Sequence, residues 1–323
     1  MPPAPPQVIA FGSCRKHKYP QPVMDAIARL KPDAWLWTGD YLYFKPTARG
    51  PTAAAELEEN YVMAATTGGE RTLRAATPII DGVYDDHDYG ENDAGGSYEH
   101  RELARRLFLD EVVGAPADSP RRTQPGGIYG VRTIGSAPRE IKVLMLDTRF
   151  ARGEPAVPSV GAVSWMPSPG NVAGLVRAAC ALFGIGSGDD ILGSEAQWAW
   201  LEHELTNSSA AAHLLVSSVQ VLTTAPPVES WGHFPRSRRR LLELLQRTRP
   251  SAALFLSGDV HFAEFLGSAH GLTASATTGA AAEGAALLEV CPSTCPECPA
   301  PASPICTALR RPLPTPLRAT EGH

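Results

Sequence analysis

Long apolar runs are missing from this sequence, and none approaches the roughly 18–20 residues that a membrane-spanning helix requires. An excess of positive charge is missing as well, because 29 Lys and Arg residues stand against 34 Asp and Glu residues, for a net charge of −5. Proteins that bind nucleic acid usually carry a clearly basic face or stripe, so this balance disfavours that class. The 323 residues, 43% of them apolar, are instead typical of a soluble globular enzyme with one large domain or two ordinary ones.

A signal peptide is also not visible, since the first residues, MPPAPP, have neither a basic start nor an apolar stretch. We therefore expect an intracellular protein by default, with the compartment left open. Cysteines are scarce where the chain is expected to fold: only Cys14 and Cys180 lie there, which argues against a disulfide scaffold.

The organisation of the chain follows from its composition. Short apolar runs alternate with helical periodicity from residue 7 to about 264, which predicts an α/β domain. The strands are expected at 7–11, 34–38, 78–83, 141–146, 213–219 and 252–256, and the helices at 22–30, 99–113, 194–205 and 238–246. We predict a Pro-rich extension at 1–6, one domain over 7–290 and a Pro- and Cys-rich, disordered tail at 291–323. The tail has the cysteine spacing of a radical-SAM cluster, but the chain ends too soon for the barrel that this motif requires.

Polar residues follow the predicted strands at the point where each strand ends. In open α/β sheets this edge is where ligands bind. A single Asp after a strand is usually a helix cap or a turn former, so the grouping carries the argument rather than any one residue. The residues in question are Cys14, Asp40, Asp86, Asp147 and Asp259.

The donor types in this group favour metal binding. Asp40, Asp86 and Asp259 offer hard oxygen ligands, while Cys14, Tyr43 and His261 add a thiolate, a phenol and an imidazole. This mixture suits two metals of different character, which would also relieve the repulsion among the carboxylates. Two such metals can clamp a phosphoryl group and activate water. His87, between Asp86 and Asp88, could protonate a leaving group.

Four local patterns give the sequence a family resemblance. They are Gly12-Ser13-Cys14, Gly39-Asp40-x-x-Tyr43, the DDHDYGEND segment at 85–93 and Ser257-Gly258-Asp259-Val260-His261. With supporting blocks at 146–149, 192–201 and 231–242, they resemble the PhoD-type alkaline phosphatases of the calcineurin-like metallophosphoesterase superfamily, in the family's order over about residues 7–265.

The resemblance implies an α/β fold in which a double β-sheet sandwich is flanked by helices, with the active site at the carboxyl ends of the strands. It implies a ferric ion, Fe(III), held by Cys14, Asp40, Tyr43 and His261. It also implies Ca2+ at a second site, where Asp40 bridges and Asp86, Asn92 and Asp259 complete the ligands. His87 is the expected acid and Arg149 the expected phosphate contact, while Asp147 is either part of the site or a structural residue that orients Arg149. Gln220 lies where relatives have a further metal ligand.

The predicted function is therefore metal-dependent hydrolysis of small phosphate esters, monoesters and also diesters, with no nucleic acid as partner. One alternative is a non-catalytic metal-binding homologue that lost activity with its C-terminal strands. This alternative arises because the resemblance to the family weakens after His261. Residues 271–290 would then have to supply the strands that close the sheet. A nuclease is the other alternative, and the missing basic stripe weighs against it. Relatives are often secreted, which opposes the intracellular default.

Overall fold

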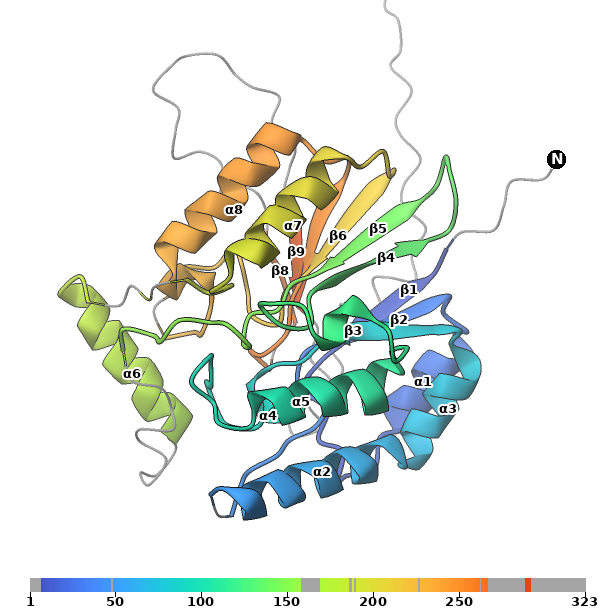
Figure 1. The fold of residues 1–323 in the computed structure, drawn as a ribbon, viewed down its shortest axis with the longest axis horizontal. Helices are drawn as coiled ribbons and strands as arrows, with labels where there is room; N and C mark the ends of the chain where they lie inside the picture. Colours follow the sequence, from blue (N-terminus) through green and yellow to red (C-terminus); the bar gives the residue numbers. More distant parts are fainter. Residues whose placement is uncertain are drawn as a thin grey trace, which may run out of the picture.

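The computed structural model describes residues 7–47, 49–157, 169–185, 188, 190–225, 227–261, 263–266 and 288–291. Two β-sheets lie face to face in it, with helices on both outer sides (Figure 1). The predicted α/β double sheet flanked by helices is thus confirmed. None of the described helices combines the length and the apolar character that crossing a membrane requires.

The smaller sheet has three parallel strands in the order β1-β2-β3. The strands are β1 (Ile9–Gly12), β2 (Ala34–Thr38) and β3 (Ile79–Val83). β2 is buried on both faces, and its alternation explains why: Ala34 and Leu36 face the other sheet, while Trp35 and Trp37 face the helices. An uninterrupted apolar strand is typical of a parallel sheet that is covered on both sides.

The larger sheet has six strands in the order β4-β5-β6-β7-β9-β8. Its four central strands are parallel and its two edge strands antiparallel to their neighbours. The strands are β4 (Gly130–Ile134), β5 (Ile141–Met145), β6 (Ala212–Val216), β7 (Ala253–Leu256), β8 (Glu264–Leu266) and β9 (Leu288–Cys291).

The helices cover the two outer faces of the sandwich (Figure 1). Next to the smaller sheet lie α1 (Pro22–Arg29), α2 (Pro51–Ala65), α3 (Gly68–Ala76) and α5 (Arg101–Leu107), which runs on into a π-helical segment, η1 (Phe108–Val113). Against the larger sheet lie α7 (Glu195–Thr206) and α8 (Pro235–Thr248). The remaining helical segments are α4 (Asp86–Tyr89), η2 (Pro120–Arg122), α6 (Pro169–Leu182) and η4 (Trp231–His233).

Three apolar cores follow from this layering. One lies between the two sheets, and the other two lie between each sheet and its helices. In β7, for example, Leu254 and Leu256 enter the core between the sheets, while Phe255 enters the core under α7 and α8. The sandwich therefore holds the carboxyl ends of strands from both sheets on one rigid frame.

The strands needed to close the larger sheet are present. β9 pairs with β7 in parallel and with β8 in antiparallel orientation, so the edge of β7 is covered. The intervening residues 267–287 and the predicted tail beyond residue 291 lie outside the described part of the chain, as does the extension at 1–6. The domain limits 7–290 stay a prediction.

Candidate metal centre

The loops that follow β1, β2, β3 and β7 meet at one edge of the sandwich. A hydrogen bond ties the two sheets together there, because Thr38 Oγ1 at the end of β2 donates to the Ser257 carbonyl after β7 at 3.2 Å. Within the larger sheet, the Gly258 N–H donates to the Ser218 carbonyl at 2.9 Å. Gly258 has to be glycine, because a Cβ at this position would lie 2.3 Å from the Thr38 carbonyl oxygen. The close approach of the two sheets brings both sets of loops to a single centre.

The backbone at this centre is unusual. Several of its non-glycine residues adopt a positive φ, a conformation that costs free energy and tends to persist at functional sites. Their φ angles lie between 51° and 70°. The residues are Cys14, Asp40, Asp93, Asp259 and His261. Four of them follow the ends of strands, and Asp93 lies in the loop after α4.

A first group of donors combines sulfur, oxygen and nitrogen. Ligand atoms of Cys14, Asp40 and His261 lie within 4.8 Å of one another. The Tyr43 hydroxyl contacts Nε2 of His261, and the Tyr43 ring packs on the His87 ring with 4.2 Å between centroids. The structure therefore brings together Cys14, Asp40, Tyr43 and His261, the four residues predicted for one metal.

A second group consists of carboxylates. Ligand atoms of Asp85, Asp86 and Asp259 lie within 4.8 Å of one another, and the same holds for Asp40, Asp86 and His87. Asp40 thus belongs to both the first and the second group, and Asp86 links it to Asp85 and Asp259. Within the described residues, both oxygens of Asp40, Oδ2 of Asp85 and Oδ1 of Asp86 are buried without a hydrogen-bond partner.

The electrostatics of the centre follow from this crowding. Burial, followed by the negative charges of Asp86 and its neighbours, raises the pKa of Asp40 well above its usual range. Burial and the nearby Asp85 do the same for the pKa of Asp259. The pKa of Tyr43 is raised by burial and by Asp40, and the pKa of His261 is lowered by burial and by the nearby His87 and Lys16. All four shifts favour the neutral form of the group, as burial in a poorly solvated site does for acids and bases alike.

Metal ions fit these residues. Buried carboxylate oxygens without partners are costly, and a cation satisfies both their charge and their lone pairs. The thiol, phenol and imidazole at one end suit a softer transition metal, while the all-carboxylate end suits a hard cation. The donor set is therefore that of a metal centre with two chemically different ends.

Three acidic residues of the centre were not among the predicted ligands. Asp85 belongs to the second group, and Asp93 and Glu229 form a further group with Asp86. Asp85 and Asp93 lie within the DDHDYGEND segment, whose repeated acids were the available signal. The sequence offers no such signal for Glu229, because this residue lies in a loop and comes near the centre only by the packing of that loop.

Arginines neutralise this further group. Arg149 Nη1 donates to Oε1 of Glu229 at 3.0 Å, Arg152 donates to the same oxygen, and Arg177 Nη2 donates to Oδ2 of Asp93 at 2.7 Å. Burial acts to raise the pKa of Glu229, but Arg149 and Arg152 outweigh it and hold the pKa well below its usual range. The group of Asp86, Asp93 and Glu229 is thus compensated by cations of the chain itself.

The placement of Arg149 differs from the predicted phosphate contact. Its side chain is 0% exposed, and its Nε donates to Oδ1 of Asp85 at 2.7 Å while both Nη atoms donate to Glu229. A phosphate could reach this guanidinium only if these buried ion pairs broke. The side chain of Arg149 thus holds Asp85 and Glu229 together, and Asp147 Oδ1 accepts the Arg149 backbone N–H at 2.9 Å. The phosphate contact stays a prediction.

Two further predicted ligands have distinct surroundings. Gln220 is buried and its Nε2 donates to Oε2 of Glu264 at 3.0 Å. Asn92 is half-buried beside Asp93, whose backbone N–H donates to Oδ2 of Asp86 at 2.8 Å. Metal binding by either residue stays a prediction.

Comparison with known proteins was made at the levels of sequence and fold. The sequence matches the PhoD-like phosphatase family over residues 9–283. The fold is similar to a solved structure described as "Structure of PhoD", with a TM-score of 0.58 and 18% identity over 89% of this chain. The match spans 56% of that protein's length.

A second solved structure, described as "GAP50 the anchor in the inner membrane complex of Plasmodium", has a TM-score of 0.41 and 10% identity over 88% of this chain and 70% of its own. No curated protein matches the sequence. With the family match extending over most of the chain and including all the residues of the centre, the chain belongs to the PhoD-like phosphatase family.

Proposed function

We propose that this chain hydrolyses phosphate esters at the metal centre. The observation that carries the proposal is the set of four buried carboxylate oxygens on Asp40, Asp85 and Asp86 that lack partners among the described residues. They adjoin a thiol, a phenol and an imidazole, so the site supplies ligands for more than one cation. Membership of a phosphatase family supports phosphate esters as the substrates.

Each side chain then has a role that its surroundings support. Cys14, Tyr43 and His261, with Asp40, would hold Fe(III). Asp86, Asn92 and Asp259 would hold Ca2+, with Asp40 between the two ions and Asp85 as an additional oxygen donor. When bound, such metals supply Lewis acidity and an activated water for attack at phosphorus.

His87 is the residue we assign to proton transfer. It is half-exposed at the centre, packed on the Tyr43 ring and close to Asp40 and Asp86. A protonated imidazole at this position can donate its proton to the oxygen of the leaving alcohol. Ester cleavage then needs no covalent intermediate with the protein.

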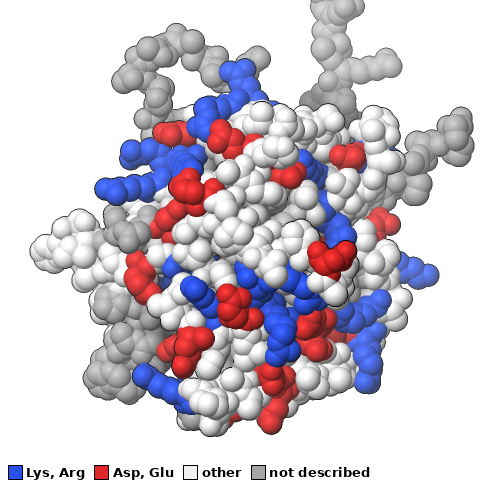
Figure 2. Space-filling model, in the orientation of Figure 1, with Lys and Arg blue, Asp and Glu red and all other residues white. Residues whose placement is uncertain are grey.

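Mixed surface charge supports a small substrate over a nucleic acid. On the face drawn in Figure 2, Lys and Arg side chains are interspersed with Asp and Glu, and no basic stripe crosses it. A non-catalytic homologue would be free to replace its ligands, yet Cys14, Asp40, Asp86, Asp259 and His261 are all present. We therefore favour the enzyme over both alternatives.

The test combines metal content with turnover. Protein purified without added metal is analysed by mass spectrometry and assayed with p-nitrophenyl phosphate and bis-p-nitrophenyl phosphate, which also ranks monoesters against diesters. We expect bound iron and calcium-dependent hydrolysis. Tyr43→Phe should abolish any visible tyrosinate-to-iron absorption band.

The matched pair of variants is Asp259→Asn and Asp118→Asn, which make the same change at the centre and at an exposed position away from it. The first should abolish turnover and the second should leave it unchanged. A folded wild-type protein that binds no metal and hydrolyses neither ester would overturn the proposal in favour of the non-catalytic homologue.

A further inference from the structure

Asp88 is a buried acid that none of the roles proposed above involves. It is 0% exposed, and it belongs to none of the ligand groups found among the described residues. It occupies the third position of α4, the single-turn helix that also carries Asp86 and His87. Because a fully buried carboxylate is costly, its contacts indicate why an acid is present at this position.

The two side-chain oxygens of Asp88 connect two loops. Oδ1 accepts the backbone N–H of Asp85 at 2.6 Å, and Oδ2 accepts the backbone N–H of Tyr41 at 2.9 Å. Tyr41, after β2, directly follows the candidate ligand Asp40. Asp85, after β3, directly precedes the candidate ligand Asp86. One carboxylate thus holds the backbone beside a candidate metal ligand in each loop.

The same two loops are in close contact elsewhere. Gly39 packs on Asp85 so tightly that a Cβ at Gly39 would lie 2.6 Å from the Cβ of Asp85. Farther along, the Phe44 N–H donates to the His87 carbonyl at 3.3 Å. Asp40, between these contacts, has a φ of 51°, a conformation that persists only where the surrounding structure holds it. The contacts therefore keep both loops in one register.

The residue type at position 88 matches this pair of contacts. An ionised carboxylate accepts hydrogen bonds at both oxygens and donates none, whereas an amide has one accepting oxygen and one donating nitrogen. An asparagine could accept only one of the two N–H groups and would direct its own N–H groups at the other. Holding both loops at once therefore favours an acid.

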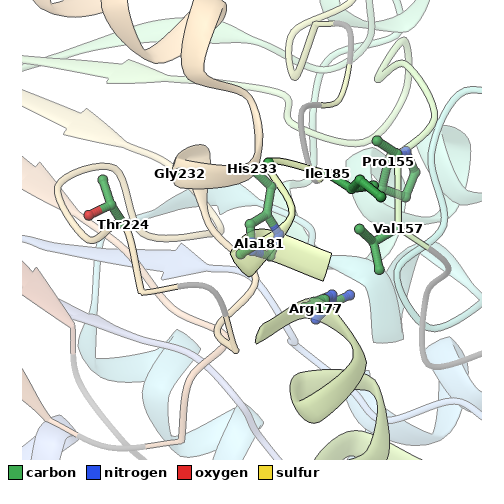
Figure 3. A pocket seen from close by; sticks show the side chains of 10 residues that line it. Pro155, Val157, Arg177, Ala181, Ile185, Thr224, Gly232 and His233 are labelled. Atoms are coloured by element: carbon green, nitrogen blue, oxygen red, sulfur yellow. The ribbon is translucent and has the colours of Figure 1, made fainter. Parts of the chain in front are cut away.

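A pocket at the end of α6 is separated from these ligands. Arg177, which lines the pocket drawn in Figure 3, is itself buried, and its Nη2 donates to Oδ2 of Asp93 at 2.7 Å. A molecule in the pocket could act on the centre only by breaking this ion pair. The contacts of Asp88 are the more direct influence on the candidate ligands.

We propose that Asp88 is a positioning residue, which fixes the separation of Asp40 and Asp86 and thereby sets the calcium affinity of the centre and the placement of His87. The proposal rests on the proposed function, because it assigns a residue that acts on the same centre. Replacing a residue that orients metal ligands typically changes metal affinity or activity by about 10- to 100-fold.

The matched variants are Asp88→Asn and Tyr61→Phe. Asp88→Asn keeps the shape of the side chain and loses one of the two links between the loops. Tyr61→Phe removes the hydroxyl group that donates to the Asp88 carbonyl oxygen at 2.7 Å, and it leaves the carboxylate in place. Each variant removes a buried hydrogen bond of Asp88, so both should lower the thermal unfolding temperature.

Calcium affinity separates the positioning role from a purely structural one. In iron-loaded Asp88→Asn, the calcium Kd from calorimetry should rise at least about tenfold. The calcium concentration for half-maximal hydrolysis of p-nitrophenyl phosphate should rise in parallel. Tyr61→Phe should keep both values within about twofold of wild type, because its carboxylate still holds both loops. Equal calcium affinities in the two variants would overturn the proposal.

A third variant separates position from charge. Asp88→Glu keeps the negative charge near the centre but displaces both oxygens from the two N–H groups. We expect it to weaken calcium binding as Asp88→Asn does. Wild-type calcium affinity in Asp88→Glu, together with weak binding in Asp88→Asn, would show that charge alone matters and would overturn the positioning role.

Amide hydrogen exchange in metal-free protein tests the links without metal or turnover. The N–H groups of Tyr41 and Asp85 should exchange slowly in wild type, and at least one of them should exchange at least about tenfold faster in Asp88→Asn. Rapid exchange of both groups in wild type would overturn the role of Asp88 and leave the proposed function standing. Metal-loaded wild type that hydrolyses neither ester would instead overturn the proposed function, and the exchange data would still decide whether Asp88 links the loops.

Discussion

At the scale of single residues, Asp40 gives the strongest indication that the centre binds a metal ion. It is 1% exposed, neither of its oxygens has a partner among the described residues, and four other aspartates raise its pKa further. Such a residue destabilises the metal-free protein, because its charge is desolvated and repelled. Its presence makes physical sense only if a cation offsets that cost.

The substitution Asp40→Asn separates the role of Asp40 in metal binding from its effect on the stability of the metal-free protein. The amide keeps the shape of the side chain but loses the charge, so metal content should fall and turnover should drop at least about a hundredfold. The metal-free variant should unfold at the same temperature as metal-free wild type or higher, because one repelling carboxylate is gone. Metal analysis, turnover and thermal unfolding with a chelator check this, with Asp118→Asn as the exposed control. Full metal content in Asp40→Asn would contradict the assignment.

Arg149 allows a second test at this scale. It asks whether the side chain contacts phosphate, as the sequence predicts, or instead holds Asp85 in place through buried ion pairs. Lysine cannot reproduce the forked contacts with both Asp85 and Glu229, so Arg149→Lys should cost about 3 kcal/mol of unfolding free energy and lower kcat as well. Arg240→Lys, which alters an exposed pair with Glu195, should cost less than about 0.5 kcal/mol. If Arg149→Lys instead raised only KM and left stability unchanged, the phosphate contact would be right.

At the scale of elements, a buried carboxylate joins the edges of the two sheets. Asp81 of β3 accepts from Arg121 Nη1 at 2.7 Å and from Arg132 of β4 at 2.8 Å. Burial acts to raise the pKa of Asp81, but the two arginines outweigh it and hold the pKa below its ordinary value of 3.8. The charged form is therefore favoured by folding.

Asp81→Asn should cost about 3 kcal/mol of unfolding free energy near neutral pH, because it leaves the largely buried Arg121 without its counter-charge. A lowered pKa in the folded state means that the stabilisation is complete above pH 3.8 and is lost as the pH falls through the folded-state value. The difference between wild type and variant should thus shrink below about pH 4. Denaturant unfolding from about pH 3 to pH 7 measures it, and a difference independent of pH would refute this account.

Elements also differ in how well the sequence predicts them. β2 and the buried face of α7 were predictable, because their apolar residues follow a clear period. β4 was missed, since it is an edge strand whose three central residues are exposed and give no apolar run. α2 was missed because its alanine-rich sequence marks no clear face, and α6 because glycine and small residues dilute its pattern.

The same physics explains what could be predicted of the site. Asp40 and Asp259 each follow a buried parallel strand, so the sequence places both at the carboxyl ends of strands, where ligands bind. The packing of the two sheets then brings the two residues to one centre. Glu229 and Arg177 lie on a loop and on a peripheral helix, and only packing brings them near the centre. Arg149 carries a charge that suits phosphate, and the sequence holds no sign that two buried carboxylates occupy its guanidinium group.

At the scale of the whole molecule, the C-terminal strand connects the larger sheet to the site. β9 lies between β7 and β8, and its buried Glu289 accepts the backbone N–H groups of Val221 and Leu222 at 2.7 and 2.8 Å. Those residues begin the loop that leads to Glu229 at the centre. Deleting the strand should therefore affect both the sheet and the centre.

Two truncated chains test this dependence. A chain ending at residue 266 loses β9, which leaves β7 as an exposed edge and two buried N–H groups without their carboxylate. It should aggregate or unfold well below the full chain and lose its metal. A chain ending at residue 292 keeps β9 and removes only the segment predicted to be disordered, so it should match the full chain.

Size-exclusion chromatography, thermal unfolding and metal analysis compare the three proteins. Aggregation of the longer truncation would show that the tail belongs to the folded domain, and a stable, metal-loaded shorter one would show that β9 is dispensable.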